Sequence, residues 1–137
     1  QNVGMIIRSA VAAGVDGLLY PKRGIAALGP LVIKASAGNV FRAPIIRCDA
    51  TASAVTALKA KGYKVAALEA SAETSLFEFK AVDSVVCVLG GESDGIATEV
   101  AALADTRLTI PMANGVESLN VAVTAALVSF HLRQAPG

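Results

Sequence analysis

The chain has 137 residues, a formal net charge of +1 and a hydrophobic fraction of 54%. This length suffices for one domain with a buried core, and the near-neutral charge lacks the basic excess of a dedicated nucleic-acid-binding module. Because only 17% of the residues are charged, we expect an additional buried surface, most simply an oligomer interface.

The cysteine, histidine and hydropathy patterns exclude several further classes of protein. Cys48 and Cys87 lie in apolar runs, which is typical of reduced core thiols, and we expect a cytoplasmic protein. One histidine and two separated cysteines do not make a zinc site, and we expect no metal. No apolar run reaches the roughly 20 residues of a membrane span, and no signal peptide is recognised. The chain begins at Gln1 inside a helical pattern, so we expect a fragment that lacks the N-terminal part of a longer protein.

The first half of the chain alternates between helical and extended patterns. The predicted elements are a helix over 4–14 closed by Gly14, a strand over 15–20, a helical turn over 24–28, an ambiguous segment over 31–37, a strand over 45–48 and a helix over 52–61. Either Asp49 or Thr51 is expected to cap the last of these helices.

The second half continues the alternation. The predicted elements are strands over 63–68, 85–89 and 107–110, a short turn around 74–80, and helices over 97–104 and 117–133. The strand over 85–89 is apolar at every position, which predicts a central parallel strand buried on both faces. The whole pattern predicts an α/β fold with a mostly parallel sheet flanked by helices.

Two polar loops follow predicted strand ends, where ligands bind in such sheets. In the first loop, Gly90 and Gly91 would let a ligand approach the backbone closely. The loop contains neither the G-x-G-x-x-G fingerprint nor a Walker lysine. Glu92 and Asp94 would repel phosphate, so the loop favours a neutral or cationic ligand such as a nucleoside. A plain turn is the alternative.

The second loop, over 111–118, has a turn signal at Asn114-Gly115, and Ser118 is a candidate helix cap. Asn120 lies in the first turn of the predicted apolar helix, where a buried amide needs hydrogen-bonding partners. Arg8 lies in an apolar helical run, either as a surface cation or as a functional residue.

The final helix is apolar on almost every side, which predicts burial on every side. At the end of a small domain, a partner subunit is the simplest cover for it. We therefore expect a homodimer that forms through this helix.

Three stretches together resemble the SpoU–TrmH family of RNA ribose 2′-O-methyltransferases, within the SPOUT superfamily. Residues 2–10 are similar to its first motif, 88–96 to its second and 110–123 to its third. Residues 34–38 resemble a segment of the branch that methylates ribosomal RNA.

The resemblance implies that residues 1–137 are a catalytic domain with a deep C-terminal trefoil knot. It implies S-adenosylmethionine as cofactor, RNA as substrate, with ribosomal RNA favoured over transfer RNA, and a dimer with the active site at the subunit boundary. The implied cofactor-binding residues are Leu89, Gly90, Gly91, Ile110, Met112, Ser118 and Leu119. The implied catalytic residues are Arg8, Asn2, Glu92, Ser118 and Asn120.

Two other functions are alternatives to this one. A catalytically silent SPOUT domain would act as an RNA-binding or dimerisation scaffold. A Rossmann-type nucleotide-binding domain is disfavoured because its glycine fingerprint and its ribose-binding acid are missing. Because the chain starts inside the first motif, we expect it to bind cofactor and dimerise but to methylate RNA weakly.

Overall fold

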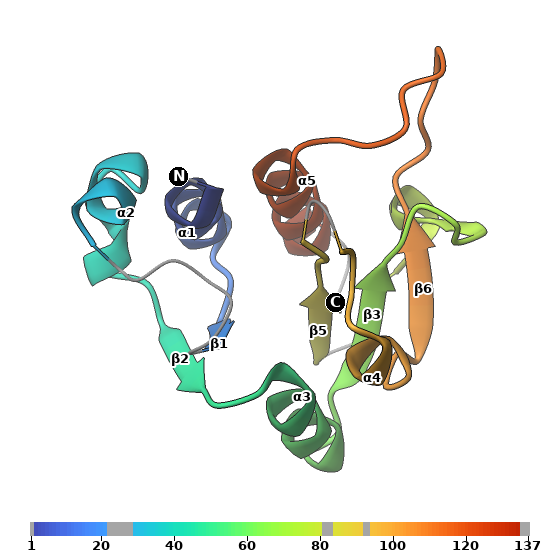
Figure 1. Cartoon of the computed structure of the whole chain (residues 1–137), viewed down its shortest axis with the longest axis horizontal. Helices are drawn as coiled ribbons and strands as arrows, with labels where there is room; N and C mark the ends of the chain where they lie inside the picture. Colours follow the sequence, from blue (N-terminus) through green and yellow to red (C-terminus); the bar gives the residue numbers. More distant parts are fainter. Residues whose placement is uncertain (1, 22–28, 81–83, 92–93, 135–137) are drawn as a thin grey trace.

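The computed structural model describes residues 2–21, 29–80, 84–91 and 94–134. Helices and strands alternate along the chain, as Figure 1 shows. The elements are α1 (Asn2–Ala13), β1 (Leu18–Pro21), α2 (Pro30–Ala35), η1 (Asn39–Phe41), β2 (Ile45–Cys48), α3 (Thr51–Ala60), β3 (Lys64–Leu68), β4 (Thr74–Ser75), η2 (Leu76–Glu78), β5 (Val85–Val88), α4 (Thr98–Ala101), β6 (Thr106–Thr109) and α5 (Val121–Gln134). The helical turn predicted over 24–28 lies outside the described residues.

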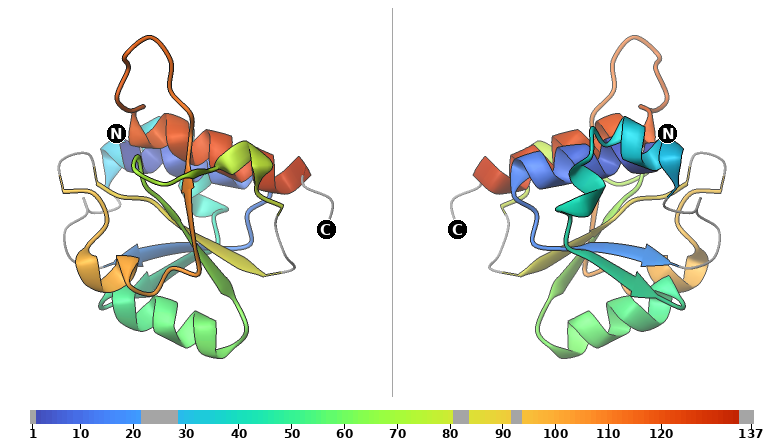
Figure 2. Two further views of the ribbon diagram at one scale, coloured as in Figure 1. Left: turned by 90° about the vertical axis from the view of Figure 1, so that its right-hand side faces the viewer. Right: turned by 90° about the vertical axis from the view of Figure 1, so that its left-hand side faces the viewer.

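Every pairing between these strands is parallel, as the alternation predicts. β1 pairs with β2, and a four-stranded sheet has the order β4-β6-β3-β5. Helices α1, α2 and α5 lie above the strands in Figure 2, and α3 lies below them. Because α3 contacts both β1 and β3, it links the two sheets. The predicted parallel α/β architecture is confirmed, and the trefoil knot stays a prediction.

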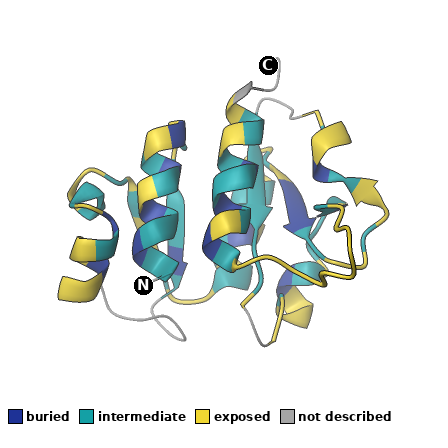
Figure 3. Ribbon diagram, turned by 90° about the horizontal axis from the view of Figure 1, so that it is seen from above, coloured by how far each residue is buried: buried dark blue, intermediate teal, exposed yellow. Residues whose placement is uncertain are grey.

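The main core forms where α5 packs on the four-stranded sheet. Ala66 of β3, Leu108 of β6 and Val128 of α5 are buried together with Leu76. Burying a leucine or valine side chain stabilises a fold by roughly 1.5–3 kcal/mol. In Figure 3 the buried positions of α1 and α5 lie along only part of each helix, and the two helices run side by side.

Two local predictions are wrong, and the structure resolves one segment that the sequence left ambiguous. The strand β5 is not central: it lies at one end of the four-stranded order and all its residues are half-buried, whereas β3 has two neighbours. The ambiguous segment over 31–37 forms α2, which ends before Gly38, whose φ is 81°. The N-cap position of α3 is Ala50, rather than Asp49 or Thr51, and no side-chain hydrogen bond caps this helix.

Both cysteines are free, half-buried thiols. Burial raises the pKa of the Cys87 thiol to about 11, so this side chain stays a neutral core thiol near neutral pH. Across the described ranges, no helix combines the length and apolar character needed to cross a membrane.

Candidate functional site

A cavity of about 790 Å³ opens at the carboxyl ends of β3, β5 and β6. Its walls come from three parts of the chain: residues 68–71, residues 89–91 with 95–96, and much of 108–124. These segments meet because parallel strands end at the same edge of a sheet. The volume is typical of sites for small molecules, which measure about 300–1,000 Å³.

The cavity brings together every residue that the family resemblance implies for cofactor binding. The residues in its wall include Leu89, Gly90, Gly91, Ile110, Met112, Ser118 and Leu119. They come from two loops that are roughly 20 residues apart in the sequence, so the strand order gathers them.

Gly90 allows the loop after β5 to fold back on itself. Gly91 and Gly95 exchange two backbone hydrogen bonds of 3.2 Å, and Gly95 has a φ of 65°. A Cβ atom on Gly90 would lie 2.6 Å from the carbonyl carbon of Gly95 and 2.9 Å from the nitrogen of Ile96. Any side chain at Gly90 would therefore displace the backbone of Gly95 and Ile96.

The cavity combines apolar walls with a negative charge. Leu68, Leu89 and Ile110 pack against the core and also line the cavity. Glu69 and Glu117 lie in the wall, and no described lining residue is a Lys, Arg or His. This composition disfavours a phosphate and suits a ligand that is apolar and cationic. The described residues contain no group of three or more His, Cys, Asp or Glu placed to hold a metal ion.

The loop over 111–120 projects away from the rest of the molecule, as Figure 2 shows, and several of its residues line the cavity. All ten of its residues are exposed. The predicted turn is confirmed, because Asn114 and Gly115 have φ angles of 59° and 74°. The final helix begins at Val121 rather than at 117, so Ser118 lies in the loop and does not cap the helix.

Asn120 caps α5. Its Oδ1 accepts hydrogen bonds from the backbone N–H groups of Ala122 at 2.7 Å and Val123 at 3.4 Å. The expectation of a buried amide inside the first helical turn is therefore wrong: Asn120 is exposed and precedes the helix. Its Nδ2 donates to Oδ1 of Asn2 at 3.2 Å, which joins the first motif to the third.

The other implied catalytic residues are placed differently. Ser118 and Asn120 line the cavity, and Asn2 accepts a hydrogen bond from Asn120 without being part of the described lining. Arg8 is exposed on α1 and is not part of the cavity wall of its own chain. Glu92 lies outside the described residues.

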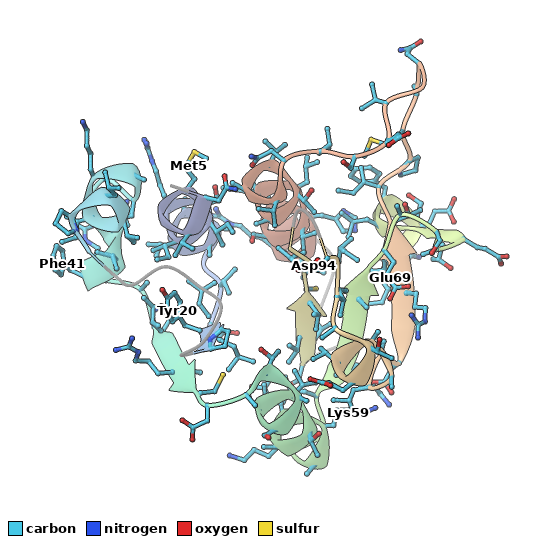
Figure 4. The ribbon with its side chains drawn as sticks, in the orientation of Figure 1. Met5, Tyr20, Phe41, Lys59, Glu69 and Asp94 are labelled. Carbon is cyan, nitrogen blue, oxygen red and sulfur yellow. The ribbon has the colours of Figure 1, made fainter. Side chains whose placement is uncertain are left out.

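Glu69 is a charged wall residue that the sequence reasoning missed. Glu69 directly follows β3 and lines the cavity, and Figure 4 shows it near the end of that strand. The guanidinium of Arg107 donates to both carboxylate oxygens of Glu69, at 2.6 and 2.8 Å. Its position right after a strand was the available signal, since the ends of parallel strands bind ligands.

Comparison with known proteins identifies the family. The SpoU rRNA Methylase family matches residues 1–130. The chain belongs to the SpoU family. A Staphylococcus aureus (strain COL) protein assigned to the TrmH family of tRNA/rRNA methyltransferases is 37% identical over 132 residues, which is 96% of this chain and 53% of that protein.

Solved structures of SpoU relatives agree with this assignment. An rRNA methyltransferase from Sinorhizobium meliloti, solved with S-adenosylmethionine bound, has a TM-score of 0.89 and 29% identity, covering 97% of this chain and 51% of its own. An RNA 2′-O ribose methyltransferase has a TM-score of 0.86 and 30% identity, covering 96% of this chain and 50% of its own. The SpoU chain therefore spans about half the length of the curated relatives that it matches.

Proposed function

We propose that the cavity binds S-adenosylmethionine. The observation that carries this proposal is that all seven implied cofactor residues line one cavity. The apolar walls suit an adenine ring, and the carboxylate of Glu117 suits the sulfonium and ammonium groups of the methionine portion. The S. meliloti relative was solved with this cofactor, which supports the same use here.

We further propose that residues 1–137 are the catalytic domain of an RNA ribose 2′-O-methyltransferase, acting in the cytoplasm and preferring ribosomal RNA. The name of the solved RNA 2′-O ribose methyltransferase supports the ribose hydroxyl as acceptor. The family description and the S. meliloti enzyme support ribosomal RNA, whereas the S. aureus relative is named for both transfer and ribosomal RNA.

The residues of the chain have to align the acceptor oxygen and ease the loss of its proton. Bound S-adenosylmethionine supplies an activated methyl group, so the protein needs little further activation of the donor. Leu89, Ile110 and Leu119 hold the apolar part of the cofactor, and the backbone of Gly90 allows its close approach. Arg8 orients the 2′-hydroxyl and stabilises the developing alkoxide, because an arginine is too basic to take the proton itself.

A homodimer would complete this site. Val123 and Phe130 of α5 are 48% and 36% exposed, and the neighbouring Leu119 is 37% exposed. An apolar face of this kind on a helix favours burial against a second copy. Because Arg8 lies outside the cavity of its own chain, we propose that the dimer brings Arg8 of the partner subunit toward the bound RNA.

The test combines calorimetry with methyl transfer. We expect S-adenosylmethionine to bind the wild-type chain and the Arg8→Ala variant equally. Transfer of a labelled methyl group to ribosomal RNA should be slow for the wild-type chain and at least about 100-fold slower for Arg8→Ala. Arg47→Ala, at an exposed arginine of β2, is the control and should keep the wild-type rate.

Two results would change the proposal. Absence of cofactor binding by the folded chain would reject it. Cofactor-independent RNA binding with no methyl transfer would instead favour the alternative, a silent SPOUT domain that acts as an RNA-binding or dimerisation scaffold.

A further inference from the structure

The Glu69–Arg107 pair has no part in the proposed reaction, yet it stands in the wall of the proposed cofactor cavity. The Glu69 side chain is 22% exposed and lines the cavity, whereas Arg107 is not part of the lining. The other ion pair of the described residues, between Lys59 and Asp105 at 3.3 Å, lies away from this cavity. Of these two ion pairs, only the Glu69–Arg107 pair is therefore placed to contact a ligand in the cavity.

The pair is held rigidly from both sides. Arg107 also donates from Nη2 to the backbone oxygen of Ala101, at 3.2 Å, at the end of α4. The backbone N–H of Glu69 donates to the backbone oxygen of Leu108 at 2.8 Å. The Glu69 carboxylate therefore has a fixed direction before any ligand arrives, which lowers the entropy cost of binding.

The charge of the pair decides which ligand group it suits. Arg107 largely neutralises Glu69, so the pair attracts a cation weakly. A carboxylate has about four acceptor positions, and a single nitrogen of Arg107 donates to both oxygens. The remaining positions suit neutral hydroxyl donors. Glu117, which has no ion pair within the described part of the chain, is the better partner for a cationic group.

We propose that Glu69 accepts hydrogen bonds from the ribose hydroxyls of S-adenosylmethionine and that Arg107 is the residue that positions the Glu69 carboxylate. The inference rests on the proposed function, because it concerns how the same cavity holds its cofactor. The neutral, donor-rich part of this ligand is its ribose diol, which lies between an apolar adenine and a cationic methionine. Glu69 is thus a determinant of specificity for a ribonucleoside over a deoxyribonucleoside.

The experiment measures discrimination between two ligands by titration calorimetry. The ligands are S-adenosylhomocysteine and its 2′,3′-dideoxy analogue. The proteins are the wild-type chain, Glu69→Ala, Glu69→Gln, Arg107→Ala and the control Lys59→Ala, which breaks the ion pair outside the cavity. The ratio of the two dissociation constants is taken within each folded protein, so a general loss of stability does not change it.

We expect the wild-type chain and Lys59→Ala to bind S-adenosylhomocysteine roughly 10- to 100-fold more tightly than the dideoxy analogue, as for hydrogen bonds to a charged group. Glu69→Ala should lower this ratio to about one. Glu69→Gln, which keeps an acceptor, and Arg107→Ala, which keeps the carboxylate, should give intermediate ratios.

A wild-type ratio of about one, or an undiminished ratio in Glu69→Ala, would overturn the inference while leaving the proposed function intact. Failure of the wild-type chain to bind S-adenosylhomocysteine would overturn the proposed function and this inference with it.

Discussion

Single residues determine the shape of the cavity wall. Gly90 lies where the loop after β5 returns within van der Waals distance of itself, and the space for a side chain is already filled by backbone atoms. Gly91 is its neighbour in the same wall, but a Cβ atom there would meet nothing within 4 Å. The two adjacent glycines therefore have different roles.

Replacing Gly90 by alanine should distort the loop. We expect Gly90→Ala to lower the free energy of unfolding by about 1–3 kcal/mol, because backbone atoms must move to admit the methyl group. Gly91→Ala is the matched control and should change that free energy by less than about 1 kcal/mol. Urea denaturation of both variants checks this, and equal losses would contradict the contact geometry.

Asp105 should make the free energy of unfolding decrease as the pH falls. A hydrogen bond from the backbone N–H of Val65, at 2.8 Å, holds the pKa of the Asp105 carboxyl below its usual 3.8; Lys59 adds to this and burial opposes it. The unfolded chain therefore takes up this proton at a higher pH than the folded chain. The contribution of Asp105 is complete above about pH 4 and is lost as the pH falls through the folded pKa.

Urea midpoints measured between about pH 2 and pH 5 test this. The midpoint of the wild-type chain should fall more steeply with acid than that of Asp105→Asn, which cannot take up a proton. Parallel curves would show that Asp105 does not contribute to acid unfolding.

At the scale of elements, α5 depends on the residue that directly precedes it, Asn120. The helix has no acidic residue in its first turn, so Asn120 supplies the local stabilisation of its exposed N–H groups. The same side chain reaches Asn2 at the start of α1. The beginning of each helix is therefore tied to that of the other.

Removing this cap should destabilise the chain. We expect Asn120→Ala to lower the free energy of unfolding by about 1 kcal/mol. Asn120→Asp keeps the acceptor oxygen and adds a negative charge at the helix N-terminus, so it should recover most of that loss. Chemical denaturation of the two variants measures the difference, and the same loss in both would mean that the cap contributes little.

Elements with a local sequence signal could be predicted, and elements defined by neighbours could not. The strand over 45–48 was predicted with its observed bounds, and Gly14 follows α1 with a φ of 78°. The start of α5 was placed four residues too early, because apolar Val116 and Leu119 continue the helical pattern into the loop. The burial of β5 was overestimated, because apolar composition does not reveal how many strands flank it.

The residues of the candidate site also fall into those that the sequence could predict and those that it could not. The loops after β5 and β6 carry motifs, so their residues could be predicted. Glu69 has no motif, and its link to Arg107 exists only because β3 and β6 are neighbours. The separation of Arg8 from the cavity depends on the packing of α1, which no periodicity specifies.

At the scale of the whole molecule, the apolar face of α5 should decide the oligomeric state. We expect the wild-type chain to sediment as a dimer and the double variant Val123→Glu/Phe130→Glu to sediment as a folded monomer, because both positions are exposed in the protomer. Leu31→Glu/Phe41→Glu is the control, since both residues are 77% exposed on α2 and η1. A monomeric wild-type chain would contradict the proposed dimer.

The contact between α1 and α5 has a consequence for how the protein is made. Because α1 precedes α5 by more than 100 residues in the sequence, α1 has no α5 to pack against, and Asn2 has no Asn120, until the ribosome has synthesised α5. The wall that Ser118, Leu119 and Asn120 give to the cavity is added in the same late step. A nascent chain that has not yet reached residues 117–124 therefore lacks this wall of the cavity.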